Sequence, residues 1–407
     1  MKQIQGGVTA AKGYQATGVE VGFKYANRKD YSLVYSEKPA RVAGTFTTNV
    51  VKAAPVKWDM NIVKYREYAQ AICLNSGIAN ACTSKEGEEI NELMASGVAK
   101  ALNIPIQSVL TASTGVIGQQ LPKDKVLIAG EKAASQLSSE LAGGTLAAEA
   151  IMTTDTISKQ CAVTFDIQGT TVTLGGMSKG SGMIHPNMAT MLAVLTSDVA
   201  ISKELLQEAL SEDVKDTFNM ISVDRDTSTN DTLVVFANGM AGNVEITEKN
   251  DDYKTFCEAL HFVNRTLAKL MAGDGEGATK LLEVTVQHAA TTEEARTLSK
   301  SVITSNLVKT AVYGSDANWG RIICALGYSG VEFDPEIVDL SIESEAGTVK
   351  LYEQGKGTDF SEELATKILS AKEVTAIVDM NMGECSATAW GCDLTYDYVK
   401  INGDYRS

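Results

Sequence analysis

Apolar side chains recur along this chain at two spacings, one typical of helices and the other of strands. Residues 88–102 carry a helical stripe made of Ile90, Leu93, Met94, Val98 and Leu102. The same spacing predicts further helices at 123–141, 202–213, 252–271, 292–311 and 361–371. Thr291 and Glu294 form a capping-box pattern, which predicts where the helix at 292–311 begins.

Shorter runs, either alternating or continuously apolar, predict strands between these helices. They lie at 161–167, 170–175, 190–196, 232–238, 281–287, 338–343, 347–353, 374–380 and 393–401. Strands interleaved with helices indicate an α/β or α+β fold with at least two sheets. The sequence contains neither a low-complexity linker nor a repeat at solenoid period.

One irregular segment follows the predicted strand at 170–175. It reads Gly-Gly-Met-Ser-Lys-Gly-Ser-Gly-Met-Ile-His-Pro-Asn-Met-Ala-Thr-Met-Leu over positions 175–192. Its glycines and proline indicate a loop, and Thr190 stands where this loop meets the next buried strand. A strand holds a hydroxyl rigidly while a loop leaves one side open to substrate, so Thr190 is a candidate nucleophile.

The Lys179–Leu192 part of this segment resembles the self-cleavage motif of the ornithine acetyltransferase family, also called glutamate N-acetyltransferases. The resemblance runs nearly from end to end, through 43–49, 75–82, 318–321 and 387–393. It implies self-cleavage between Ala189 and Thr190, which gives an α chain (1–189) and a β chain (190–407) that share one folded unit. It also implies a layered α/β/β/α architecture with mixed sheets and a smaller C-terminal region.

The chemistry that the resemblance implies depends on activating a weak nucleophile. A threonine hydroxyl needs a base, and cleavage before Thr190 would supply one as the new α-amine, with a reference pKa of about 7.7–8.0. In cleavage the hydroxyl attacks the carbonyl of Ala189, the acyl group moves from nitrogen to oxygen, and hydrolysis frees the amine. Each such step passes through an oxyanion, which needs hydrogen-bond donors worth roughly 2.7–4 kcal/mol apiece.

The resemblance extends to site residues outside the loop. Thr114 and Gly115 match the oxyanion hole, although the residues 111–118 taken alone favour an ordinary turn. The positions that match substrate-binding residues are Thr153, Lys179, Thr190, Glu276, Asn402 and Ser407. Lys179 would supply local positive charge, and Ser407 keeps the hydroxyl of the family's threonine.

The implied reaction is a ping-pong acetyl transfer. Thr190 attacks the acetamide of N-acetylornithine, releases ornithine and keeps the acetyl group as an ester, which the amine of glutamate then takes. One amide replaces another, so no ATP, metal or other cofactor is expected. Acetyl-CoA stays open as a co-substrate because the family has single- and dual-activity members. The family also implies an assembly of two α and two β chains.

Other interpretations stay open beside this one. A self-processing hydrolase or aminopeptidase of the same architecture is the main alternative, and a binder of small ligands that never processes is another. Residues 176–180 satisfy the Gly-x-Ser-x-Gly pattern of a nucleophile elbow, but an elbow must turn directly into a helix. The sequence that follows, through Pro186, disfavours a helix.

Composition narrows the possible partners and the compartment. The formal net charge is −15 and there is no basic run, which disfavours nucleic acid and anionic membranes as partners. Seven scattered cysteines and the lack of any apolar run near about 18 residues predict a soluble, cytoplasmic protein with free thiols. The three histidines lack metal-ligand spacing. Residues 230–232 match a glycosylation pattern that has no meaning without secretion.

Overall fold

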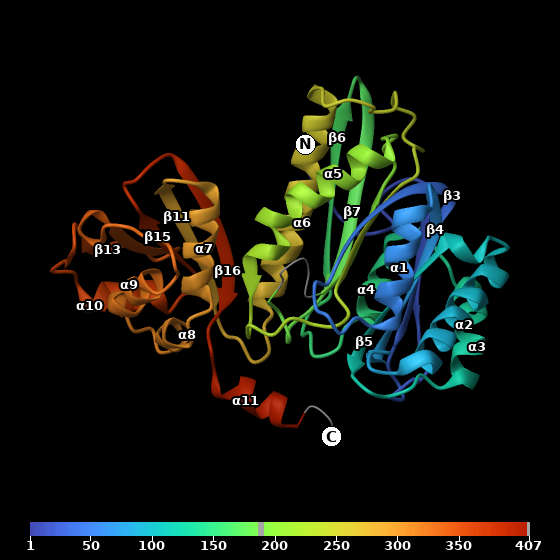
Figure 1. Cartoon of the computed structure of the whole chain (residues 1–407), viewed down its shortest axis with the longest axis horizontal. Coiled ribbons are helices and arrows are strands. Elements are labelled where there is room, and N and C mark those ends of the chain that lie inside the picture. The colour runs from blue at the N-terminus through green and yellow to red at the C-terminus, as the bar shows by residue number, and fades with distance from the viewer. Residues whose placement is uncertain (186–190, 405–407) are drawn as a thin grey trace. The chain divides into compact units, whose positions relative to one another are not determined.

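The computed structural model describes residues 1–185 and 191–404, in two compact units (Figure 1). The first unit takes in residues 1–180, 186–218 and 227–267, and the second, smaller unit takes in 181–185, 219–226 and 268–407. Ala189, Thr190 and Ser407 lie outside the described residues. The predicted chains 1–189 and 190–407 have a different boundary from these units, and that division stays a prediction.

The first unit contains one mixed sheet and the helices that cover it. Its strands are β1 (Lys2–Ile4), β2 (Tyr14–Val19), β3 (Tyr31–Phe46), β4 (Tyr68–Ile78), β5 (Val109–Val116), β6 (Lys159–Ile167), β7 (Thr170–Lys179), β8 (Leu192–Ser197) and β10 (Thr232–Ala237). They are ordered β1-β6-β7-β8-β10-β3-β4-β5, with β2 beside β3. Its helices are α1 (Ala54–Tyr65), α2 (Ser84–Leu102), α3 (Lys123–Ala134), α4 (Leu141–Ala150), α5 (Lys203–Asp213) and most of α6 (Asp251–Gly273).

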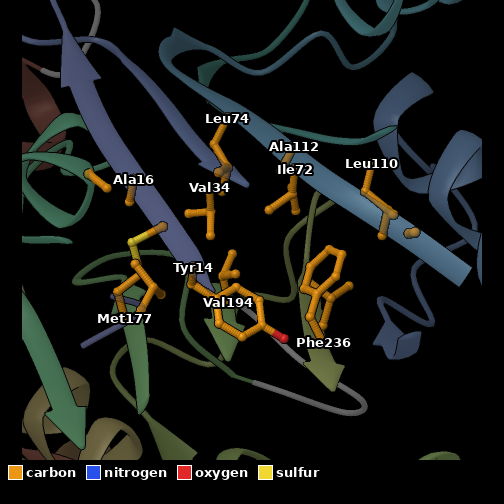
Figure 2. Packing of buried hydrophobic residues seen from close by; sticks show 14 of the residues in the cluster. Tyr14, Ala16, Val34, Ile72, Leu74, Leu110, Ala112, Met177, Val194 and Phe236 are labelled. Carbon is orange, nitrogen blue, oxygen red and sulfur yellow. The ribbon is translucent and has the colours of Figure 1, made fainter. Parts of the chain in front are cut away.

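The long strand β3 joins two layers of this sheet. Its residues 31–35 pair with β4, its residues 41–46 pair with β10, and the register shifts between Tyr35 and Ala40. Side chains from β4 and β5 meet side chains from β7, β8 and β10 in one buried cluster (Figure 2). Among the members of this cluster are Ile72, Leu74, Leu110, Ala112, Met177, Val194 and Phe236. The two layers therefore face each other across a shared apolar core.

Helices cover the outer face of each layer. Leu33 of β3 and Cys73 of β4 alternate with the shared-core residues and pack against α2 and α3. On the other layer, Phe256 of α6 packs against Phe165 of β6 with ring centroids 6.5 Å apart. This α/β/β/α order confirms the layered architecture that the family resemblance implies.

The second unit contains a separate mixed sheet in the order β14-β13-β12-β15-β11-β16-β9. Its strands are β9 (Ile221–Ser222), β11 (Leu281–Ala289), β12 (Asp339–Ser344), β13 (Gly347–Glu353), β14 (Lys356–Gly357), β15 (Glu373–Asp379) and β16 (Cys385–Cys392). Its helices are α7 (Thr292–Ile303), α8 (Asn306–Tyr313), α9 (Trp319–Gly327), α10 (Glu362–Leu369) and α11 (Tyr396–Gly403), together with the end of α6. Two mixed sheets confirm the predicted fold class.

Three predicted elements are wrong in their detail. The helix predicted at 123–141 ends at Ala134, and a separate helix, α4, begins at Leu141. The helix predicted at 292–311 is two helices, because the Ser305 hydroxyl accepts a hydrogen bond from Val308 N and starts α8 anew. The strand predicted at 393–401 is instead helix α11, which the Thr395 hydroxyl caps by accepting from Tyr398 N. The capping box at the start of α7 is confirmed in both of its hydrogen bonds.

The nucleophile-elbow alternative is excluded, because its serine lies inside a strand and not at a turn from a strand into a helix. Ser178 lies within β7, paired with Lys159 on one side and Ala193 on the other, and it is 2% exposed. No helix follows it among residues 179–185. Within the described ranges, no helix is long and apolar enough to cross a membrane.

The shared core between the two layers predicts a large cost for a cavity there. Leu74→Ala, at a fully buried position, should lower the free energy of unfolding by about 2–5 kcal/mol. Leu127→Ala, at a position 53% exposed, is the control and should change it by less than about 0.5 kcal/mol. Urea denaturation measures both, and equal effects would contradict the two-layer core.

Candidate active site

Lys179 gathers two of the other predicted site residues around its ammonium group. It is the last residue of β7, pairs with Leu192 of β8, and is 7% exposed. Its Nζ donates to Thr153 Oγ1 at 2.9 Å and to Thr114 Oγ1 at 3.3 Å. Three predicted site residues from three separate segments therefore lie together within the first unit, although their individual roles stay predictions.

Thr114 and Gly115 lie in a strand, so the turn that the local sequence favoured is wrong. The chain stays extended in β5 through Val116 and pairs in parallel with β4, where Gly77 lies opposite Gly115. Gly115 has a φ of +131°, and a Cβ there would lie 2.2 Å from the carbonyl carbon of Gly77. Only glycine fits this position, because a side chain would collide with rigid backbone.

The Asp155 carboxylate fixes the backbone around this cluster. Its Oδ1 accepts from Lys159 Nζ and Gly180 N, each at 2.7 Å, and its Oδ2 accepts from Thr153 N at 3.0 Å. The side chains of Asp155 and Lys159 are both fully buried. Burial alone would raise the pKa of Asp155, but the ammonium groups of Lys179 and Lys159 hold it well below its ordinary value. Asp155 is therefore ionised throughout the physiological pH range.

The start of β8 is tied to the same end of the two layers. Thr232 N donates to Met191 O at 2.9 Å, and Met191 directly follows Thr190 in the sequence. The neighbouring Asn230 donates through Nδ2 to Ser113 O at 2.8 Å and to Ala79 O at 2.6 Å. The segment 230–232 thus hydrogen-bonds both to Met191, which precedes β8, and to Ser113, which precedes Thr114 in β5.

Glu276 and Asn402 lie together in the second unit. The Glu276 carboxylate accepts from Asn402 Nδ2 at 2.7 Å, and the Glu276 N–H donates to Ser181 O at 2.9 Å. A Cβ added to Gly182 would lie 2.4 Å from the carboxyl carbon of Glu276, so a glycine there leaves room for the carboxylate. The structure therefore brings these two predicted substrate-binding residues together, next to Gly182 of the cleavage motif.

Polar contacts also hold the motif residues 183–185 within the second unit. Asp224 accepts from Met183 N at 2.6 Å and Ile184 N at 2.9 Å. His185 Nδ1 lies 3.1 Å from Ser222 Oγ. Burial, together with the charges of Lys300 and Arg225, lowers the pKa of His185 to about 4. His185 is therefore neutral at physiological pH and does not supply a proton there.

Sequence reasoning missed Asp155, Lys159, Asn230 and Asp231. Asp155 lies two residues after Thr153, and Lys159 is the next basic residue in the sequence. The spacing of Asp155 and Lys159 is only a weak indication of an ion pair. Asn230 and Asp231 precede an apolar strand, but their match to a glycosylation pattern hid any structural role. Within residues 1–185 and 191–404, no group of three or more metal-ligating side chains is placed to hold an ion.

Comparison with known proteins gives the family. Residues 15–407 match the model of the ArgJ family. The arginine biosynthesis bifunctional protein ArgJ 1 of Clostridium acetobutylicum is 54% identical over 98% of this chain and 97% of its own length. The arginine biosynthesis bifunctional protein ArgJ of Caldanaerobacter subterraneus subsp. tengcongensis is 52% identical over the whole of both chains. This chain therefore belongs to the ArgJ family, which confirms the resemblance seen in the sequence.

A solved structure is also similar to part of the chain. It is an ornithine acetyltransferase complexed with ornithine, from Mycobacterium tuberculosis. It is 38% identical, covers 47% of this chain and 99% of that chain, and has a TM-score of 0.43.

Removal of one partner of the buried Asp155–Lys159 ion pair should lower stability strongly, and removal of both charges should lower it less. Asp155→Asn removes the carboxylate that neutralises the buried Lys159 ammonium, so the free energy of unfolding at pH 7 should fall by about 3–5 kcal/mol. The double variant Asp155→Asn/Lys159→Met removes both charges and should regain much of that loss. Chemical denaturation of the two variants measures this, and equal losses in both would contradict the ion-pair explanation.

Proposed function

We propose that this protein transfers the acetyl group of N-acetylornithine to glutamate through an acetyl ester on Thr190, within arginine biosynthesis. The observation that carries the proposal is the Lys179 ammonium bound to Thr153 and Thr114 near the start of β8, in a chain that belongs to the ArgJ family. This set supplies a buried cation and two hydroxyls. Lys179 pairs with Leu192 of β8, which lies two residues after the proposed nucleophile in the sequence. Amino-acid carboxylates are the substrate groups that such a cation binds.

The proposed catalytic cycle uses the threonine twice. After self-cleavage at Ala189–Thr190, the α-amine of Thr190 takes the proton of its own hydroxyl as the hydroxyl attacks the acetamide. Thr114 and Gly115 are proposed to stabilise the oxyanion, and Gly115 allows the close backbone approach to Gly77 that no other residue would fit. Ornithine leaves, and glutamate attacks the ester. Water has to be excluded between the two steps, or the ester hydrolyses.

The charged groups of the substrates are proposed to bind to residues of complementary charge. Lys179 and Thr153 are proposed to bind the α-carboxylate that N-acetylornithine and glutamate share. Glu276, which is 7% exposed, is proposed with Asn402 to bind the cationic side chain of ornithine. Ser407 is proposed to add a hydroxyl from the C-terminal residue.

The proposal extends to co-substrate, assembly and place of action. No metal or cofactor is required for exchange of one amide for another. Acetyl-CoA is proposed as a second acetyl donor, in keeping with the word bifunctional in the names of both relatives. We place the enzyme in the cytoplasm, as two α and two β chains. A hydrolase of this architecture is the alternative, and product analysis with and without glutamate separates it, since a hydrolase releases acetate in both cases.

Thr190 gives the sharpest test of the proposal. Thr190→Ala removes the nucleophile, so it should abolish both processing and acetyl transfer, while Thr190→Ser should retain some of each. Denaturing mass spectrometry of wild-type protein should find two species, residues 1–189 and 190–407, whose masses sum to the precursor plus one water. A Thr190→Ala enzyme with near-normal turnover would refute the proposal.

Lys179 tests the proposed carboxylate site. Lys179→Ala removes a charge-assisted hydrogen bond worth about 1.5–3 kcal/mol, so KM for N-acetylornithine and glutamate should rise roughly 10- to 150-fold. Lys85→Ala, at a position whose side chain is 86% exposed, is the matched control and should leave KM unchanged. Steady-state kinetics measures both variants, and an unchanged KM in Lys179→Ala would remove this role.

A further inference from the structure

Asp231 is a buried acid for which the acetyl-transfer mechanism has no use. It is 1% exposed, and neither carboxyl oxygen makes a hydrogen bond of ordinary geometry among the described residues. The hydroxyls of Thr47 and Ser228 and the N–H of Met191 are close enough to favour its ionised form. Thr47 nevertheless directs its own hydroxyl to Ser228 O, at 2.8 Å. A buried carboxyl without a full set of partners is costly, which points to a role other than stability.

The position of Asp231 suggests what that role is. It stands between Asn230, which binds the strand that carries Thr114, and Thr232, whose N–H binds Met191 O. Thr232 lies opposite Leu192 in the parallel ladder, so Asp231 precedes β10 at the height where Met191 precedes β8. Lys179 also acts on it electrostatically. Asp231 is thus a carboxyl beside the residue that directly follows Thr190 in the chain.

Self-cleavage poses a chemical problem that the later transfer reaction does not. Before cleavage, the nitrogen of Thr190 is part of an amide and has no basic lone pair, so the α-amine cannot yet activate the hydroxyl. His185 does not solve this problem, because its pKa of about 4 makes it a weak base. Burial raises the pKa of Asp231 well above its ordinary value, which brings its basicity toward working pH.

We propose that Asp231 is the general base of self-cleavage, and this inference rests on the proposed function. The Asp231 carboxylate takes the proton of the Thr190 hydroxyl as Oγ bonds to the carbonyl carbon of Ala189. When the tetrahedral intermediate collapses, the C–N bond breaks and Asp231 returns the proton to the leaving nitrogen. Water then adds to the ester and releases the Ala189 carboxyl group and the Thr190 hydroxyl, so atoms and protons balance.

The test follows the processing of freshly made full-length protein. Wild type, Asp231→Asn, Asp231→Glu and Asp198→Asn are produced by cell-free synthesis, and mass spectrometry records the loss of the 407-residue precursor with time between pH 5 and 9. Asp198 is the matched control: it is also 1% exposed and its pKa is raised by burial, but it follows the opposite end of β8 and accepts from Thr173 N and Lys12 N.

The expected result is a rate loss with a distinctive pH dependence. Asp231→Asn should process roughly 10²- to 10⁴-fold more slowly, the usual contribution of a general base. Wild type should slow as pH falls through the raised pKa of Asp231, and the Asn variant should lack that decline. Asp231→Glu should keep part of the rate, and Asp198→Asn should match wild type.

Thermal unfolding separates this role from a structural one. An acid whose pKa is raised by folding favours the native state less as pH rises through that pKa, so Asp231→Asn should melt at the same or a higher temperature at pH 8. Processing of Asp231→Asn at the wild-type rate, or a slower rate that keeps the wild-type pH profile, would overturn the inference. A wild-type chain that never cleaves would instead refute the proposed function itself.

Discussion

The arrangement of the candidate site depends on one buried carboxylate. Asp155 binds the Lys159 ammonium and two backbone N–H groups, those of Thr153 and Gly180. Because Gly180 follows Lys179 directly, the carboxylate fixes the residues on both sides of the hydrogen bond from Lys179 to Thr153. Its ionised form is maintained by Lys159, to which it is hydrogen-bonded, and by Lys179, since the charges of these lysines outweigh the effect of burial on its pKa. Loss of this one charge would remove the hydrogen bonds to Thr153, Lys159 and Gly180 at once. Loss of a single surface contact would have a much smaller effect on the site.

Much of the fold could be predicted from hydrophobic period alone. The helices at 202–213 and 252–271 and eight of the nine predicted strands lie where the apolar spacing indicates, whereas β1 to β5 and β16 were not predicted. The prediction failed where local hydrogen bonds decided the outcome, as at Ser305 and Thr395, whose hydroxyls start new helices. It also did not predict β3, the strand whose two halves pair with different layers of the sheet on either side of a register shift. The layered order came instead from the family resemblance.

The site could be predicted only in part: residues that match a family motif were found, and buried acids outside such a motif were not. Thr114, Thr153 and Lys179 were found by resemblance, and the structure places both threonine hydroxyls within hydrogen-bond distance of the Lys179 ammonium group. Asp155 and Asp231 have no local pattern that marks them, because a buried acid and an exposed acid look alike in a sequence. What distinguishes them is burial, which raises or lowers a pKa only once the chain has folded around the group. Chemistry that depends on tertiary burial is therefore the part that sequence reasoning misses.

The balance of buried charge connects these residues to the chemistry of the substrates. The chain as a whole carries a formal charge of −15, which repels amino-acid carboxylates. Near Thr153, by contrast, the ammonium groups of Lys159 and Lys179 both act on the Asp155 carboxylate, and Lys179 also acts electrostatically on Asp231. An ionised Asp231 would suit a precursor that must deprotonate its own threonine and has no substrate to bind. A protonated Asp231 would suit the mature enzyme, in which the α-amine of Thr190 serves as the base and Lys179 has to attract an anion. Burial raises the pKa of Asp231 and so favours its protonated state, the state that does not oppose the transfer reaction.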